Sequence, residues 1–380
     1  MKLPQPWATS LNYASGPDTG TPTKVDPAST ANGFIRGTAA AAQHVNFNLH
    51  PLAETTRRTY TTGCLTLRLL DAVDQDDLTD GLAVDATAVT VRSLLIKAST
   101  TGATVAHSGP STTAVGVLAG ITDSLKQAAR VSTTVVAIGA GGTQNARSGN
   151  TGNTWTAGGA SGLITDLVSI AADGTEFCVV SAAGGSAHGT GATWTVATTG
   201  DDISDVVTGG GVSSVAGIED LFVAVGLEAT DPAFARSVDH GVLWTAASGT
   251  VPNAASHTDA GWITSDGASA FYHAGYRASV TCDVASSPDG NTWTALASLT
   301  SAAAITGVKI MHCPQTDLLV VAMQHGTLNV EVRASTDAGA TWSEPEYLQG
   351  FVLAGLGVTG GRLFGSKGAR LYASDGVGSE

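Results

Sequence analysis

Five of the seven tryptophans occur in one recurring short sequence. The fullest copy is Ser-Thr-Asp-Ala-Gly-Ala-Thr-Trp at 335–342, and the copy at 237–244 differs in having Leu in place of the Thr before Trp. The copy at 148–155 has Asn at the Asp position, that at 287–293 is one residue shorter, and that at 187–194 keeps only Gly, Thr and Trp. Successive tryptophans are 39, 50, 49 and 49 residues apart. A repeat of this period indicates one supersecondary unit used several times, so we expect a chain built from similar stacked units.

The residue types of this motif favour a tight turn that leads into a strand. An Asp or Asn side chain accepts hydrogen bonds from backbone N–H groups further along the turn, and Gly adopts the positive φ that such a turn requires. Thr suits the strand that follows, and the tryptophan can cover the turn with its large apolar ring. The candidate structural residues are Ser148, Asn150, Gly152, Trp155, Gly191, Trp194, Ser237, Asp239, Gly241, Trp244, Ser287, Asp289, Gly290, Trp293, Ser335, Asp337, Gly339 and Trp342.

Between the motifs, each unit carries a turn signal followed by a short apolar run rich in β-branched residues. These runs, at 177–180, 221–225, 271–274 and 318–322, predict strands. A unit of about 40–50 residues with about four strands is typical of a β-propeller. We therefore expect an all-β propeller of about seven four-stranded blades, six or eight also being possible, over residues 61–380. A parallel β-solenoid or a chain of sandwich domains fits the period less well.

The last unit ends at 371–376 in a truncated motif that has no tryptophan. A strand from earlier in the chain, such as the apolar segment 64–70, could complete this unit and remove an exposed sheet edge.

The motif resembles the Asp-box, or bacterial neuraminidase repeat, S-x-D-x-G-x-T-W. This resemblance implies that each copy caps the hairpin between the outer two strands of a propeller blade, and that its residues have a structural role. The family also includes sialidases and other glycoside hydrolases. A sialidase would need three converging arginines, a Tyr–Glu pair and an acid Asp, and no segment of the family's (F/Y)-R-x-P type is present. Arg147, Arg236 and Arg333 precede copies of the motif, which predicts positions on outer strands and not in a central pocket.

Residues 1–60 do not share the repeat, and their prolines predict an extended arm. The alanine run after Thr38 favours one short helix at about 39–49. The segment 33–46 resembles the start of bacteriophage tail-fibre and tail-associated proteins through Gly33, Phe34, Gly37, Ala42, Gln43 and Asn46. This resemblance implies an arm that attaches to other virion proteins, in several copies per particle. It implies a virion location after assembly in the host cytoplasm, and a propeller that contacts neighbouring proteins or a host-surface glycan or protein.

Charge and composition exclude several other roles. The net charge is −14 and the six lysines are scattered, so we expect no nucleic-acid partner. The four cysteines lie far apart, which predicts free thiols. No apolar run approaches the roughly 18 residues of a membrane span, so we expect neither a signal peptide nor membrane insertion.

The sequence contains no HExxH motif or Cys/His cluster, and the apolar runs carry no paired carboxylates for glycosidase chemistry. We therefore expect no catalytic residues, no metal and no cofactor. The acidic segment 71–80 could bind a cation, but it is interpreted as a solvated loop. The hypothesis is a non-enzymatic structural protein of a phage tail, fibre or baseplate. The alternatives are a bacterial glycan- or protein-binding propeller and a glycoside hydrolase.

Overall fold

The computed structural model describes residues 121–374 apart from short gaps, and upstream of them the strands at 67–69, 78–84, 94–99, 104–108 and 112–116. The predicted arm, its helix at 39–49 and the resemblance at 33–46 lie outside the described residues. The chain divides into two units, Met1–Thr62 and Gly63–Glu380.

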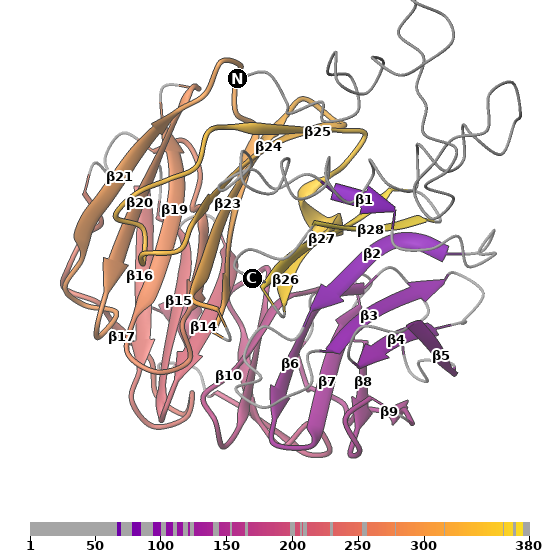
Figure 1. The fold of residues 1–380 in the computed structure, drawn as a ribbon. Helices are drawn as coiled ribbons and strands as arrows, with labels where there is room; N and C mark the ends of the chain where they lie inside the picture. Colours follow the sequence, from indigo (N-terminus) through magenta and orange to yellow (C-terminus); the bar gives the residue numbers. More distant parts are fainter. Residues whose placement is uncertain are drawn as a thin grey trace, which may run out of the picture. The chain divides into compact units, whose positions relative to one another are not determined.

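The described part of the second unit consists of antiparallel four-stranded sheets with almost no helix (Figure 1). Five blades follow one another along the chain, and the structure describes most of their side chains. Their strands are β6 (Leu125–Val131), β7 (Thr134–Gly139), β8 (Asn145–Ser148) and β9 (Thr156–Ala157); β10 (Leu167–Ala172), β11 (Phe177–Ser181), β12 (Ser186–Gly189) and β13 (Trp194–Val196); β14 (Val212–Ile218), β15 (Leu221–Glu228), β16 (Asp231–Ser237) and β17 (Thr245–Ala246); β18 (Trp262–Ser265), β19 (Phe271–Arg277), β20 (Thr281–Ser287) and β21 (Thr294–Thr300); and β22 (Gly307–Cys313), β23 (Leu318–His325), β24 (Asn329–Ser335) and β25 (Glu346–Gln349). The fold is thus an all-β propeller with four-stranded blades, as predicted.

Two further four-stranded sheets are described by their backbone pairing. One contains β2 (Leu78–Val84), β3 (Leu94–Ser99), β4 (Thr104–Ser108) and β5 (Thr112–Gly116) in order. The other contains β26 (Leu356–Thr359), β27 (Arg362–Lys367) and β28 (Arg370–Ser374), and its fourth strand is β1 (Leu67–Leu69) from the start of the unit. β1 is antiparallel to β28, with Leu67 opposite Ser374, so the expected completion of the last unit by an earlier strand is confirmed.

The first strand of each sheet lies beside the first strand of the next. These contacts join β6 to β10, β10 to β14, β14 to β18, β18 to β22 and β22 to β26, and β2 contacts both β26 and β6. The first strands are therefore the inner strands around the axis of the propeller. The predicted apolar runs are the second strands, β11, β15, β19 and β23, and every residue of β23 is buried.

The hydrophobic core lies between blades. One cluster joins Val223 and Phe234 of the β14–β17 blade to Ile263 and Phe271 of the next blade, and equivalent clusters fill the neighbouring interfaces. Because each core is shared by two blades, a single blade cannot bury its apolar faces alone.

Polar side chains on three inner strands bond to the backbone of the following inner strand. Gln127 Oε1 accepts from the Ile170 N–H at 3.2 Å, and Ser169 Oγ accepts from the Val215 N–H at 3.1 Å. Ser214 Oγ continues the series by accepting from the Ile263 N–H at 2.9 Å. These bonds satisfy N–H groups that have no strand partner on the axial side, and they fix the spacing of neighbouring blades.

The only helical segments among the described residues are two 3₁₀ turns, η2 (Ile203–Asp205) and η4 (Leu353–Gly355). Neither is long or apolar enough to cross a lipid bilayer.

Candidate functional site

The five tryptophan motifs form turns that join the third and fourth strands of the five blades from β6 to β25. We call these segments, at 148–155, 187–194, 237–244, 287–293 and 335–342, the tryptophan turns. In the turn at 237–244, Ser237 Oγ donates to Asp239 Oδ1 at 2.7 Å and accepts from the Gly241 N–H at 2.9 Å. Asp239 Oδ1 also accepts from the Leu243 N–H at 3.0 Å. The Ser and Asp side chains therefore satisfy the backbone donors of the turn.

The same hydrogen bonds recur at 148–155, where Asn150 takes the Asp role, and at 335–342. The shorter turn at 287–293 keeps the Asp289 bonds to the N–H groups of Asn291 and Thr292. The turn at 187–194, which lacks Ser and Asp, closes with a bond from the Thr190 N–H to the Thr193 carbonyl. The motif glycine has a positive φ in all five turns, between 70° and 92°.

Each of three turns packs against the preceding blade through its glycine. A Cβ atom at Gly191 would lie 2.3 Å from Val136, one at Gly290 would lie 2.2 Å from Val223, and one at Gly339 would lie 2.7 Å from Leu296. The tryptophans extend this contact: Trp293 is 9% exposed and its ring lies 4.7 Å from the ring of Phe234 in the preceding blade. The turns therefore connect blades as well as strands.

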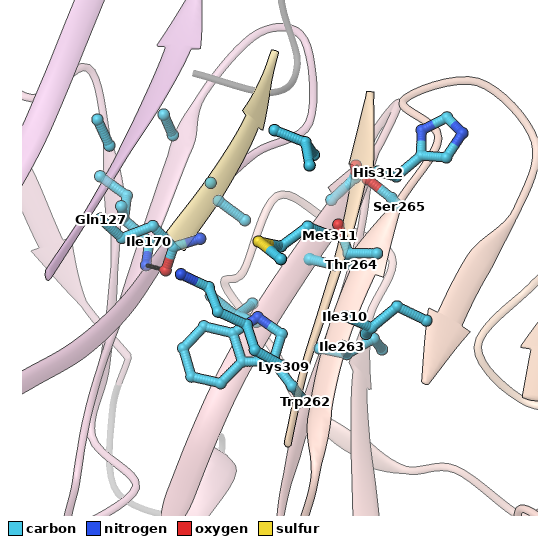
Figure 2. Close-up of a pocket in the computed structure, with 18 of the residues that line it drawn as sticks. Gln127, Ile170, Trp262, Ile263, Thr264, Ser265, Lys309, Ile310, Met311 and His312 are labelled. Atoms are coloured by element: carbon cyan, nitrogen blue, oxygen red, sulfur yellow. Dashed lines mark hydrogen bonds between the residues drawn. The ribbon is translucent and has the colours of Figure 1, made fainter. Parts of the chain in front are cut away.

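A cavity of about 80 Å³ lies at the axis, between the inner strands β6, β10, β14, β18, β22 and β26 (Figure 2). Most of its described lining is backbone or apolar, including Met311 and Trp262, and its lining residues include no Asp or Glu. Its charged groups are two lysines, Lys126 on β6 and Lys309 on β22. This cavity is the candidate ligand site of the described fold.

The two lysines are held in the same way. Lys126 Nζ donates to the Leu167 carbonyl of the following inner strand at 2.9 Å, and Lys309 Nζ donates to the Leu356 carbonyl of its following strand at 2.8 Å. Lys309 Nζ also lies 5.6 Å from the centre of the Trp262 ring, and Figure 2 shows its side chain running along that ring. Burial lowers the pKa of Lys309 to about 8, because the cavity solvates an ammonium less well than water does.

Two buried carboxylates occupy equivalent places on the third strands of neighbouring blades. Asp283 on β20 accepts from Arg277 Nε at 2.5 Å and from Ser298 Oγ. Burial raises the pKa of Asp283, but the hydrogen bonds from Arg277 and Ser298 outweigh it, so the net pKa is lowered. Glu331 on β24 is completely buried and bonds to Arg333 and to Ser301 Oγ at 2.7 Å. Neither carboxylate lines the central cavity.

Ser, His and a carboxylate meet at Ser301, His325 and Glu331, but not in the order that nucleophilic catalysis requires. Ser301 Oγ lies 3.3 Å from His325 Nε2, and Glu331 Oε2 lies 3.4 Å from that same nitrogen. His325 Nδ1 instead contacts the Ala304 carbonyl at 3.1 Å. A catalytic triad needs the serine and the carboxylate on opposite ring nitrogens, and this serine donates directly to the carboxylate. The cluster is a buried polar network.

A second histidine cluster links two blades at the surface. His240, in the turn at 237–244, lies between Asp173 Oδ2, 2.7 Å from its Nδ1, and Asp220 Oδ1, 3.5 Å from its Nε2. The hydrogen bond to Asp173 raises the pKa of His240. Among the described residues this is the one group of three carboxylate, imidazole or thiol side chains close enough to hold a metal ion. Because the two carboxylates contact different ring nitrogens, the arrangement suits a protonated histidine better than an ion, which would bind one nitrogen only.

The arginines before the motifs, Arg147, Arg236 and Arg333, lie on the third strands β8, β16 and β24 and outside the central cavity. Cys178, Cys282 and Cys313 are buried and form no disulfide among the described residues, while Cys64 lies outside them. Sequence reasoning missed the two cavity lysines, which we had treated as scattered. A signal was available: Lys126 and Lys309 precede a motif tryptophan by 29 and 33 residues, which places both near the start of a unit.

Comparison with known proteins shows the fold. Among solved structures, the GH74 xyloglucanase from Xanthomonas campestris is 15% identical over 83% of this chain and 54% of the xyloglucanase, with a TM-score of 0.54. This chain therefore spans about half the length of that protein. YCF48 bound to the D1 peptide is 15% identical over 69% of this chain and 82% of that chain, with a TM-score of 0.49. A computationally designed protein, Ika8, is 9% identical over 81% of this chain and 99% of its own, with a TM-score of 0.48.

No family model and no curated protein matches this sequence. The blades and the xyloglucanase comparison define the class: the protein is a β-propeller. Fold alone does not fix activity in this class, which includes enzymes and binding proteins.

Proposed function

We propose that this protein is a non-enzymatic structural component of a bacteriophage virion, in which the propeller contacts neighbouring virion proteins or the host surface. The attachment role rests on the resemblance of 33–46 to tail-fibre proteins. The observation that carries the non-enzymatic part is the central cavity, whose described lining contains two lysines and no carboxylate. Glycoside hydrolysis ordinarily needs two carboxylates that flank the substrate about 5–10 Å apart.

Three buried carboxylates elsewhere in the described blades support the same proposal. Asp283 and Glu331 are held by arginines, and Asp173 accepts bonds from the Thr175 and Glu176 N–H groups. A general acid or base must reach a substrate proton within hydrogen-bond distance, and buried groups bonded in this way do not.

We further propose that the tryptophan turns are Asp-boxes and that the ring has seven blades. The Ser–Asp–Gly hydrogen bonds of three turns support the first point. The seven four-stranded sheets, and the contacts of β2 with both β26 and β6, support the second.

The direct test is mass spectrometry and immunogold labelling of virions purified from cultures of the source organism. We expect the chain in stoichiometric amounts with the tail proteins and gold at the tail. Virions without this chain would overturn the proposal.

Two further assays separate the alternatives. A glycan array probed with the purified chain identifies a host-surface glycan if the propeller binds one. A glycoside-hydrolase screen, with the Asp283→Asn and Glu331→Gln variants as controls, addresses the enzyme: turnover that one carboxylate substitution abolishes would reject the non-enzymatic proposal.

A further inference from the structure

The central cavity places positive charge at the axis of a strongly acidic protein. The chain carries a net charge of −14, yet the charged side chains lining the cavity are Lys126 and Lys309. Both donate to backbone carbonyls, which are neutral acceptors and do not cancel an ammonium charge. The six inner strands from β6 to β26 contain no Asp or Glu. The two lysines therefore lie in a cavity whose described lining supplies no counter-ion.

Lys126 and Lys309 are both half-buried, and a cation with reduced access to water is costly unless an opposite charge compensates it. The lysines sit on β6 and β22, which are separated around the ring by other inner strands on both sides, so their charges converge on the cavity from different directions. An anion in the cavity would lie in the electrostatic field of both lysines. It would supply the compensation that the described lining lacks.

The rest of the lining restricts what kind of anion fits. Met311 lies one strand repeat from Lys309 on the same face of β22, and Trp262 borders the ammonium (Figure 2). Met311, Ala128 and Ile170 offer apolar contacts and no side-chain donors, and Trp262 offers its ring face and one indole N–H. A volume of about 80 Å³ accommodates a molecule of a few heavy atoms.

We propose that this cavity binds a small monocarboxylate with a short alkyl chain, its carboxylate between Lys126 and Lys309 and its alkyl group against Met311 and Trp262. This proposal does not depend on the virion role. The binding experiment tests the cavity and the virion experiment tests the location, so either proposal can fail while the other holds.

The test uses the full-length chain and sodium butyrate, with butyramide as the uncharged analogue and inorganic phosphate as an anion without an alkyl group. Isothermal titration calorimetry at fixed ionic strength measures affinity, and NMR of lysine labelled at Cε locates the site, because the chain has only six lysines. We expect butyrate to bind at least tenfold more tightly than butyramide or phosphate. Two of the six lysine signals should shift when butyrate binds. Lys126→Met and Lys309→Met should each remove one of these two shifted signals, and each should weaken butyrate binding at least tenfold.

The matched control is Arg362→Met, which removes one positive charge at an exposed position of β27 outside the cavity. It should leave butyrate binding unchanged. If Arg362→Met weakened butyrate binding as much as the lysine variants do, the effect would come from net charge alone, and the proposal would be overturned. Failure of butyrate to bind, equal binding of butyramide, or tighter binding of phosphate would also overturn it. The sequence of β2 contains one carboxylate, Asp80. Butyrate binding that appears only after Asp80→Asn would show that the chain supplies its own counter-ion, and would reject the site.

Discussion

His240 is held between two carboxylates from different blades, Asp173 in the β10–β11 connection and Asp220 in the β14–β15 connection. The Asp173 hydrogen bond raises the pKa of His240, so protonation of the histidine and folding favour each other. The stabilisation is fully present below the ordinary histidine pKa of about 6.5 and is lost as the pH rises through the raised value.

We therefore predict that His240→Gln lowers the free energy of unfolding at pH 5.5 and changes it little at pH 8.5. The expected loss at pH 5.5 is about 0.5–1 kcal/mol, because the imidazole is partly exposed and solvent screens the pair. Urea denaturation at the two pH values measures it. The same loss at both values would show that the ring acts through packing and not through charge.

For Lys309 the expected change of stability with pH has the opposite direction. Its pKa falls to about 8 in the folded protein, whereas an unfolded chain has an ordinary lysine pKa near 10.4, so the unfolded state binds more protons between these values. The stability of the protein should therefore rise as the pH increases from about 8 to 10, as the cost of the charged lysine disappears. Lys309→Met should be more stable at pH 7 by about 1–2 kcal/mol, after allowance for the lost hydrogen bonds to the carbonyls of Leu356 and, at 3.5 Å, Leu353, and should lack this rise.

Urea denaturation in buffers free of carboxylates, from pH 7 to 10, checks both parts. Lys309→Arg is the matched control, because it keeps the charge over that range. A less stable Met variant at pH 7 would mean that the two carbonyl contacts outweigh the cost of burying the charge.

At the scale of the structural element, the tryptophan turn both closes a hairpin and packs against the preceding blade. Trp244 is 2% exposed and belongs to a core shared with Cys178 and Phe222, whereas Trp342 is only partly buried. We predict a loss of about 2–4 kcal/mol for Trp244→Ala and a smaller loss for Trp342→Ala, although the Trp342 Nε1 bond to the Gly339 carbonyl is also removed. Thermal and urea denaturation of both variants gives the order, and an inverted order would contradict the burial argument.

The docking role can be isolated with two glycines that share a positive φ. Gly290 has φ 70° and a Cβ there would collide with Val223 of the preceding blade, while Gly326 has φ 60° and open space around the Cβ position. Both substitutions to alanine carry the cost of left-handed backbone, about 1 kcal/mol, but only Gly290→Ala must also separate two blades. We predict that Gly290→Ala is at least 1–2 kcal/mol more destabilising in urea denaturation. Equal losses would mean that backbone conformation alone requires the glycine.

How much of this was predictable differs between the turns and the cavity. The turns are local: Ser237, Asp239 and Gly241 lie within five residues, so the sequence pattern contains nearly all of their geometry. The strands and the closure by β1 followed from apolar runs and an incomplete last unit. The cavity is not local, because Lys126 and Lys309 are far apart in sequence and meet only once the inner strands surround the axis. The repeat shows which residues occupy equivalent positions in their units. It does not show which other side chains lie next to them at the axis.

At the scale of the whole molecule, the pairing of β1 with β28 joins the beginning of the propeller to its end. A chain starting at residue 63 keeps this pair, whereas one starting at residue 77 loses β1 and leaves β28 as an unpaired edge. We predict that the 63–380 chain melts cooperatively near the temperature of the full chain. The 77–380 chain should melt at lower temperature and self-associate, since an exposed edge strand is a template for pairing. Calorimetry and light scattering of the two chains test this, and indistinguishable behaviour would show that the pair is dispensable.

The seam between β1 and β28 also sets an order of events during synthesis. Leu67–Leu69 leaves the ribosome long before Arg370–Ser374, its partner strand, has been made. While the nascent chain grows, successive blades can form and dock on one another, but the circle stays open until the final strand emerges. A chain truncated anywhere before that point would therefore form an open arc of blades with unpaired ends and not a smaller closed ring.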